Sequence, residues 1–408
     1  MIRTYKYLLR PNNEQFKRLD FLLLQHRLVY NTTLEQRIAV YKETGKSVKY
    51  TEQSKYFLDL RRSNPETLGQ VNASSLQHTL RRLDKAFSAF FRRLKEGKKA
   101  GFPRFKRANR FRSIEFTYGD GCKLRQNEHG RMSFHIQNVG EIRVCYHRAI
   151  PANAKVKHVV IKRVNERWYV SLILEVPDQT ENRIPTGNQV GIDVGLKSLI
   201  ALSTGELIEN PRWLKKNLAK LRRLQRHASR QIKGSNRQRK TYWQIARLHE
   251  KIANQRADYL HKVSRWLVTN NDLIAIEDLA LGFMNKNRHL SQSSHDAGFG
   301  LFRQMLEYKA ESAGVQVIAV NPSNTTQACS ECGSIVPKGL SVRVHKCPHC
   351  GLVIDRDVNS ARNILHKALH NPLGRSGQAI TRRLRQVLLE KPSLYKGMEN
   401  VTWLVLCS

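Results

Sequence analysis

The chain has 408 residues and carries 71 lysines and arginines against 33 aspartates and glutamates, a formal net charge of +38. A hydrophobic content of 40% suffices for globular cores and excludes extensive disorder. The sequence contains neither a run of about 18 apolar residues nor an N-terminal export signal, so we expect no membrane partner. The charge predicts nucleic acid as the partner, because lysine and arginine contacts to phosphates release counterions.

The first 180 residues pass from helical to strand patterns. Alternation over residues 1–10 predicts a strand, and helical spacing of apolar residues predicts a helix over 13–44 that ends near Gly45. A second helical stretch covers 51–97. Glycine turns then separate short alternating segments, which predict a small antiparallel barrel with strands at residues 114–118, 131–136, 141–144, 156–163 and 168–175.

Basic and aromatic residues alternate between residues 92 and 112. Phe102, Phe105 and Phe111 are interleaved there with cations that include Arg104 and Lys106. Such a segment binds nucleic acid when its cations pair with phosphates and its rings stack on bases. The alternative is a solvated basic linker, since charge runs are common in linkers.

The second half predicts a sheet interrupted by helices. Residues 189–202 indicate a buried hairpin, residues 272–277 and 314–320 two further strands, and residues 299–312 a helix between them. Residues 211–270 predict two helices broken near residue 234, with 17 basic and two acidic residues and therefore a net charge of 17 − 2 = +15. This excess favours contact with a duplex backbone over a merely solvated face.

Four cysteines near the C-terminus form two CxxC pairs separated by 14 residues: Cys329, Cys332, Cys347 and Cys350. This spacing predicts tetrahedral zinc, and the site is structural because four thiolates leave no open position. Two unrelated turns with buried thiols are the alternative. The other three cysteines are scattered, which indicates a reducing cytoplasm and no disulfide framework.

Three acidic residues stand in contexts where a free carboxylate is costly. Asp193 interrupts an apolar strand, Glu277 ends an apolar run, and Asp357 precedes a helix expected over residues 360–366. Together they predict an oxygen-rich site for Mg²⁺, where two ions would hydrolyse a phosphodiester. Singly, Asp193 could cap a turn, Glu277 could pair with an arginine, and Asp357 could cap its helix, while Asp355 is a second candidate for the third position.

An ordered set of motifs resembles TnpB, the RNA-guided endonucleases of bacterial insertion sequences, which are related to type V CRISPR effector nucleases. The motifs are both CxxC pairs and the segments 191–195, 276–279 and 355–363, and further similar segments are 101–106, 295–298 and 306–310. The resemblance extends from about residue 1 to residue 368.

The resemblance implies a multidomain chain of α/β and α+β parts. Its nuclease domain would be RNase H-like, of the RuvC type, and would carry an inserted zinc ribbon, beside a β-barrel wedge domain and a helical recognition lobe. The implied ranges are 1–10 for the first wedge strand, 11–99 for the recognition lobe, 100–184 for the wedge, 185–324 for RuvC with the basic hairpin 211–270, 325–354 for the ribbon, 355–370 for the last RuvC helix, and 371–408 for a tail of unknown structure.

By the same resemblance, Asp193, Glu277 and Asp357 are the catalytic triad that holds two Mg²⁺ ions, and the cysteines hold one Zn²⁺. A guide RNA from the end of the mobile element would select double-stranded DNA beside a short motif, and a separate transposase would act alongside. Expected nucleic-acid contacts are Tyr50, Gln77, Arg81, Phe102, Arg104, Phe105, Lys106, Arg222, Arg223 and Arg226. Alternative functions are a guided DNA-binding repressor that does not cut, and a transposase that needs no RNA.

Overall fold

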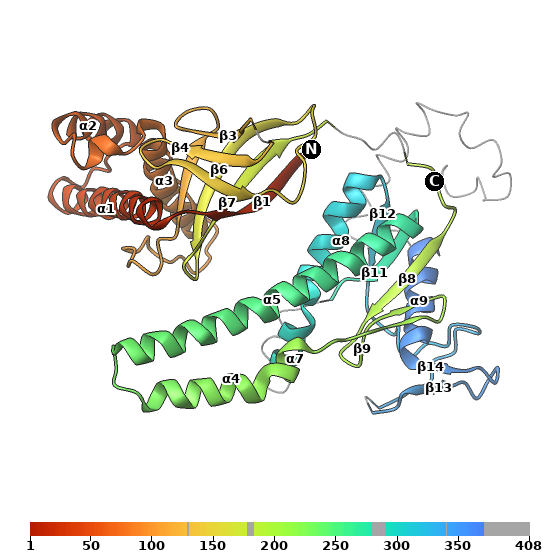
Figure 1. Cartoon of the computed structure of the whole chain (residues 1–408). Helices are drawn as coiled ribbons and strands as arrows, with labels where there is room; N and C mark the ends of the chain where they lie inside the picture. Colours follow the sequence, from red (N-terminus) through yellow and green to blue (C-terminus); the bar gives the residue numbers. More distant parts are fainter. Residues whose placement is uncertain (129, 178–182, 280–286, 288–289, 340, 371–408) are drawn as a thin grey trace. The chain divides into compact units, whose positions relative to one another are not determined.

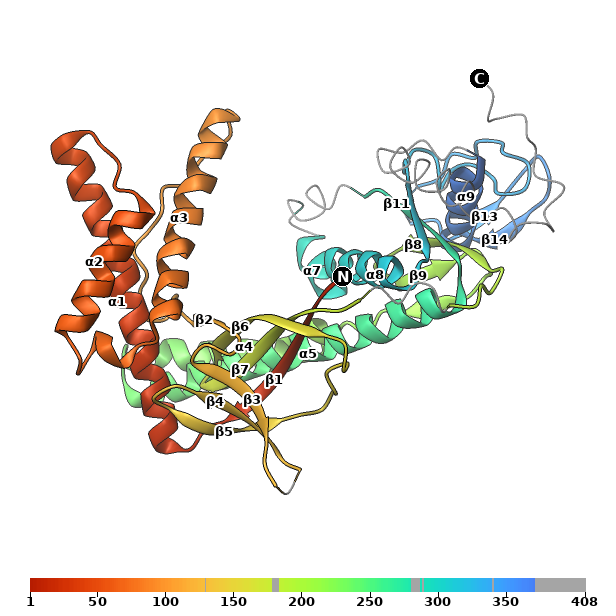
Figure 2. The same ribbon diagram turned by 90° about the horizontal axis from the view of Figure 1, so that it is seen from above.

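The computed structural model describes residues 1–128, 130–177, 183–279, 287, 290–339 and 341–370. The chain forms two compact units, Met1–Asp178 and Gln179–Ser408, and each is described by itself (Figures 1 and 2). The predicted tail after residue 370 lies outside the described residues. No helix in the described part of the chain is both long enough and apolar enough to span a membrane.

The first unit is built on a seven-stranded antiparallel sheet. Its strands, in the order in which they pair, are β2 (Ser113–Thr117), β6 (Lys155–Val164), β7 (Arg167–Glu175), β1 (Ile2–Arg10), β5 (Gly140–Cys145), β4 (Met132–Ile136) and β3 (Cys122–Gln126). The predicted strands are confirmed, and the polar edge strand β3 was not predicted. No pairing joins the end strands β2 and β3 in the described residues, so closure into a barrel stays a prediction.

Three helices pack beside this sheet: α1 (Asn13–Thr44), α2 (Tyr50–Ser63) and α3 (Ala73–Lys95). Helix α1 begins at a capping box in which Asn12 and Gln15 bond reciprocally, and ends at Gly45 with a φ of 65°, as predicted. The helical stretch predicted over 51–97 consists of two helices, and the break between them was not predicted: the chain leaves the helix before Pro65 and restarts where Asn72 caps α3.

One hydrophobic core joins the sheet and helices of the first unit. Alternate residues of β7 supply Trp168, Val170, Leu172 and Leu174, all fully buried. Helix α3 contributes an apolar stripe that begins at Leu76. This stripe is therefore part of the core, and the basic residues of α3 lie on its other face.

The second unit contains a five-stranded mixed sheet. Its strands, in pairing order, are β10 (Leu207–Glu209), β9 (Ser198–Leu202), β8 (Gln189–Val194), β11 (Leu273–Glu277) and β12 (Gln316–Val320). Strands β8, β9 and β10 form an antiparallel meander, while β11 and β12 continue the sheet parallel to β8. The first and fourth strands of this unit are therefore neighbours at its centre, although 78 residues separate them in the chain (273 − 195).

Helices cover both faces of this sheet. Helices α5 (Asn236–Asn270) and α8 (Phe299–Ala313) pack on one face through a core that includes Leu267 and Leu306. Helix α9 (Arg356–His370) packs on the other through Ile364 and Ala368. A short helix, α7 (Ser291–Ala297), precedes α8 and was not predicted.

The first half of α5 lies beside α4 (Trp213–Arg230) in a long hairpin (Figure 1). A small core of Leu221, Ala228, Ile245, Leu248 and Ile252 holds the two helices together. The predicted pair of helices is confirmed, with the break between residues 230 and 236.

A cysteine-bearing segment connects β12 with α9. It contains the two-stranded ladder of β13 (Val344–Lys346) and β14 (Val353–Asp355). Arg356, the first residue of α9, donates its backbone N–H to Arg343 O at 2.8 Å. The segment therefore ends directly in the helix that carries Asp357.

Candidate active site

Asp193 and Glu277 occupy neighbouring positions on adjacent parallel strands. Ile192 of β8 pairs with Ile276 of β11, and each is followed by one of the two acidic residues. Parallel strands lie about 4.8 Å apart, so the pairing brings the two carboxylates to the same end of the sheet. The sequence predicted both residues as site candidates, but the alignment of the two strands needed the fold.

Asp357 reaches this end of the sheet from α9. The helix passes so close to β8 that a Cβ atom on Gly191 would lie 2.1 Å from Ala361 O. A Cβ on Gly195 would lie 3.9 Å from Asp357 Oδ2, so the second glycine of the segment 191–195 faces the acidic side chain. Both glycines therefore allow the helix to bring its carboxylate toward the strand that carries Asp193.

The N-terminus of α9 lies earlier than the helix expected over residues 360–366, and within the range 355–370 that the resemblance implies. The helix begins at Arg356 rather than at Ser360, and Asp357 lies in its first turn. Asp355 Oδ1 accepts a hydrogen bond from Asp357 N at 2.8 Å, the interaction of a helix-capping residue. Asp355 is therefore the cap, which leaves Asp357 as the acidic residue available to the site.

The three acidic residues influence one another electrostatically. The pKa of Asp193 is raised well above its ordinary value, first because protein atoms displace water from its carboxylate and then because Glu277 and Asp357 repel its charge. Arg356 opposes this rise. Desolvation also raises the pKa of Glu277. The hydrogen bond from the Thr325 hydroxyl and the charge of Lys367 act in the opposite direction and lower this pKa.

The three ionised carboxylates destabilise one another, and a bound divalent cation would offset this repulsion. A desolvated carboxylate that two further negative charges repel is costly until a cation neutralises the group. Their oxygen donors are the ligand type that Mg²⁺ takes in proteins. The three do not all lie within 4.8 Å of one another, in contrast to the four cysteine sulfurs.

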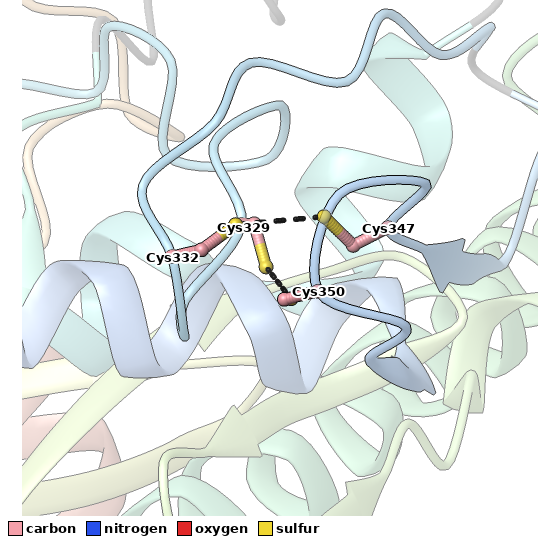
Figure 3. Close-up of side chains that lie close together, drawn as sticks. All are labelled: Cys329, Cys332, Cys347 and Cys350. Carbon is pink, nitrogen blue, oxygen red and sulfur yellow. Dashed lines mark hydrogen bonds between the residues drawn. The ribbon is translucent and has the colours of Figure 1, made fainter.

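The four cysteines form a tighter group, with their sulfur atoms all within 4.8 Å of one another (Figure 3). Cys329 Sγ lies 3.6 Å from Cys350 Sγ, and Cys332 Sγ lies 3.6 Å from Cys347 Sγ. Sulfurs around tetrahedral zinc, with bonds of about 2.3 Å, lie about 3.8 Å apart. Two turns from separate segments therefore meet as a zinc ribbon requires.

Tyr50, Gln77 and Arg81 gather on one side of the helices α2 and α3. Arg81 Nε donates to Tyr50 Oη at 3.2 Å, and its guanidinium lies 5.7 Å from the centre of the Tyr50 ring. Gln77 is one helical turn before Arg81 on α3. Tyr50 and Arg81 are therefore in direct contact, and Gln77 lies one turn from Arg81 along α3.

The aromatic residues of the basic segment differ in exposure. Phe102 and Phe105 are 47% and 52% exposed, as stacking on bases requires. Phe111 is 1% exposed and lies in the core, with the Arg82 guanidinium 5.0 Å from its ring centre, so its predicted stacking role is wrong. Arg104 is exposed, whereas Lys106 is half-buried over the Tyr30 ring.

The predicted arginines of the basic hairpin lie on its surface. Arg222, Arg223 and Arg226 are all exposed on α4, while Leu221 and Leu224 belong to the core that joins α4 to α5. A polyanion can therefore reach these side chains without any rearrangement of the helices.

Comparison with known proteins identifies the family of this chain. A family model described as "Probable transposase" (OrfB_IS605) matches residues 171–288, and one described as "Cas12f1-like, TNB domain" matches residues 299–364. A protein of Streptomyces pristinaespiralis named "Putative RNA-guided DNA endonuclease" is 34% identical over 374 residues, which are 90% of this chain and 89% of that protein. The chain belongs to the TnpB family.

A second relative supports this membership. "Putative RNA-guided DNA endonuclease InsQ" of Escherichia coli K12 is 33% identical over 386 residues, 89% of this chain and 92% of that protein. A third family model, described as "Helix-turn-helix domain", matches residues 1–46, which in this TnpB chain form β1 and the single helix α1.

Among solved structures, a chain titled "Cryo-EM structure of the Cas12f1-sgRNA-target DNA complex" matches with a TM-score of 0.60 at 17% identity. The match covers 86% of this chain and 83% of that chain. At this identity the likeness concerns the fold alone. It supports the overall fold of this TnpB chain, while the four clustered cysteines fit a zinc ribbon.

Two further residues contact the triad, and of these Thr325 was not predicted. Thr325 donates its hydroxyl to Glu277 Oε1, and Arg356 pairs with Asp357 at 3.2 Å. Arg356 is marked in the sequence by its place between two acidic residues, as a side chain that could help to hold a phosphate. A threonine 48 positions after Glu277 carries no such signal, because only the fold brings it to the carboxylate.

Proposed function

We propose that this TnpB chain is an RNA-guided DNA endonuclease that hydrolyses phosphodiester bonds at Asp193, Glu277 and Asp357. The carrying observation is the register of β8 and β11, which aligns Asp193 with Glu277 beside the helix that bears Asp357. The names of relatives that span nine-tenths of the chain support both the RNA guide and the DNA target.

The three carboxylates would hold two Mg²⁺ ions, with Asp193 placed between the other two acidic groups. Bound there, the ions would activate a water and stabilise the leaving oxygen of the phosphodiester. Arg356, which pairs with Asp357, limits the negative charge that an approaching phosphate meets. The cysteine group would hold one structural Zn²⁺, since all four positions are thiolates.

The positive surface would hold the nucleic acids while base pairing supplies most of the specificity. The exposed arginines of α4, with the hairpin's net charge of +15, suit the backbone of a duplex. Tyr50, Gln77 and Arg81 would lie beside the short motif in the target, and Phe102 and Phe105 would stack on unpaired bases. In this proposal residues 11–99 are the recognition lobe and residues 100–184 most of the wedge domain.

The direct test incubates protein purified with its RNA and motif-flanked DNA, once with Mg²⁺ and once with EDTA. Cleavage only in Mg²⁺, and only of DNA complementary to the guide, is expected. Sequencing the copurified RNA identifies the guide and therefore the matched target.

Two outcomes would replace the proposal. Tight guided binding with no Mg²⁺-dependent cleavage would indicate a repressor. Strand joining by protein freed of all RNA would indicate a transposase that acts alone.

A further inference from the structure

Thr325 connects the zinc ribbon with the nuclease carboxylates. It lies in the loop between β12 and the first CxxC pair, where its side chain is buried at 2% exposure. Its hydroxyl donates to Glu277 Oε1, and Pro322 O, at 3.0 Å, is the other acceptor within reach. A hydroxyl has one proton, and the ionised carboxylate is the stronger acceptor, so this proton goes to Glu277 once a cation holds that residue ionised.

Helix α9 fixes the loop that carries Thr325. Asn363 donates its two side-chain N–H groups to Thr325 O at 2.8 Å and to Ala328 O at 2.7 Å. Both acceptors are backbone carbonyls, and Asn363 is buried. The position of Thr325 is therefore set by the same helix that presents Asp357.

A second asparagine, one turn earlier on α9, extends this connection into the ribbon. Asn359 donates to Ala328 O at 2.7 Å and accepts a hydrogen bond from Ser330 N at 2.9 Å. Ser330 directly follows the zinc-ligand candidate Cys329. The two asparagines thus supply hydrogen-bond partners to the backbone around the first cysteine turn and align this turn with α9. Catalysis itself does not explain this role of two residues of the motif 355–363.

We propose that Thr325 is a positioning residue that orients the Glu277 carboxylate for its cation. Its hydrogen bond occupies Oε1 and leaves Oε2 to face the site, since a carboxylate held at one oxygen can no longer rotate freely. Hydrogen-bond partners of metal-ligating carboxylates typically change metal affinity by about 10- to 100-fold when removed. The proposal rests on the proposed nuclease function, because it assigns Glu277 to the cation.

The chain supplies a matched control for the test. Thr326 is the next residue and is exposed, so Thr326→Val makes the same chemical change without touching Glu277. Thr325→Val replaces the hydroxyl by a methyl group at nearly constant volume, and Thr325→Ser keeps the hydroxyl.

The first measurement is guided cleavage by each RNA-loaded full-length variant across a Mg²⁺ titration. Thr325→Val is expected to need about 10- to 100-fold more Mg²⁺ for half-maximal cleavage, with guide and target binding unchanged. Thr325→Ser should recover most of the loss, and Thr326→Val should match the unmodified chain.

The second measurement reports cation occupancy without relying on nuclease activity. Fe²⁺ replaces Mg²⁺ in the RNA-loaded protein, and ascorbate with peroxide generates radicals that cut the polypeptide beside the bound ion. Backbone fragments ending near residue 277 should form at lower Fe²⁺ concentration in the unmodified chain and Thr326→Val than in Thr325→Val.

Two results would overturn the proposal. One is an unchanged Mg²⁺ and Fe²⁺ dependence in Thr325→Val. The other is a loss of zinc or thermal stability shared by Thr325→Val and Thr325→Ser, which would show that the residue serves folding. Failure of the proposed function looks different, because the unmodified chain itself would then not cleave guided DNA.

Discussion

The cysteine group and the carboxylate group are both metal-site candidates, yet they are built in opposite ways. The cysteines lie within 22 residues of chain, from Cys329 to Cys350, and their sulfurs already meet within 4.8 Å. The carboxylates come from two strands and a helix, 84 and 80 residues apart in sequence, and do not meet that spacing. Four thiolates fill the tetrahedral coordination shell of a zinc ion. Carboxylates that are spaced further apart leave coordination positions of a cation open for water and substrate phosphate.

This difference in construction indicates different roles for the two groups. The ribbon supports itself through local turns and through Asn359 and Asn363 of α9. The carboxylate site is electrostatically unfavourable by itself, since the charges of Glu277 and Asp357 raise the pKa of Asp193. Zinc would therefore contribute to stability, and magnesium to chemistry.

The largest expected effect is the loss of cleavage in Asp193→Asn. The change keeps the shape of the side chain but removes a charged ligand, so guided cleavage should fall at least about a thousandfold, or about 4 kcal/mol of transition-state stabilisation. Binding of RNA and matched DNA, measured by gel shift, should stay within about twofold because the phosphate contacts remain. If the variant cleaved at a rate close to that of the unmodified chain, Asp193 would not be a catalytic residue, and the carboxylate group would lose its proposed chemical role.

Cys347→Ser should affect the folded state instead of the chemistry. The buried Cys347 sulfur is replaced by a poor zinc ligand, so zinc content should fall and Tm should drop by at least about 5 °C. Metal analysis and a thermal melt of the same preparation measure both. A soluble variant that lacks zinc yet keeps full Tm and activity would contradict the assignment of a structural ribbon.

The smallest effect concerns the stability of protein stripped of Mg²⁺. The folded-state pKa of Asp193 is raised, so the folded chain holds this proton more tightly than the unfolded chain, and stability is lost as pH rises above about 3.9 toward the folded pKa. Asp193→Asn lacks this loss and should melt roughly 2–4 °C higher than the unmodified chain at neutral pH in EDTA.

The advantage of Asp193→Asn should shrink at about pH 5 and vanish in Mg²⁺, because the ions stabilise the ionised carboxylates. Thermal melts at both pH values, with and without Mg²⁺, measure it. A variant less stable than the unmodified chain in EDTA would show that Asp193 is held by interactions other than a cation.

Local patterns predicted most elements correctly because their signals are local. The end of α1 at Gly45 follows from the ease with which glycine adopts a positive φ. The predictions differed from the structure where a local break signal was overlooked or where the local pattern was ambiguous. Pro65 and the cap Asn72 marked the break between α2 and α3, and Phe111 looked like its exposed neighbours although only packing decides which ring of a mixed segment is buried.

For the candidate site, the sequence supplied the residue types and the tertiary structure supplied their relation. Cys329, Cys332, Cys347 and Cys350 could be grouped by spacing, since a CxxC turn fixes the separation of its sulfurs through the backbone alone. Asp193, Glu277 and Asp357 were predicted together as one site, but their neighbourhood depends on strand pairing and on a helix that crosses β8 at Gly191.

By itself, the sequence determined the net charge, the paired cysteines, the family motifs and most of the longer helices and strands, because each is a property of short segments. Only the tertiary structure decided that β11 lies next to β8, that α9 crosses β8 at Gly191, and that Thr325 bonds Glu277. These relations join residues tens of positions apart through hydrogen bonds and packing, and such contacts have no counterpart in local spacing.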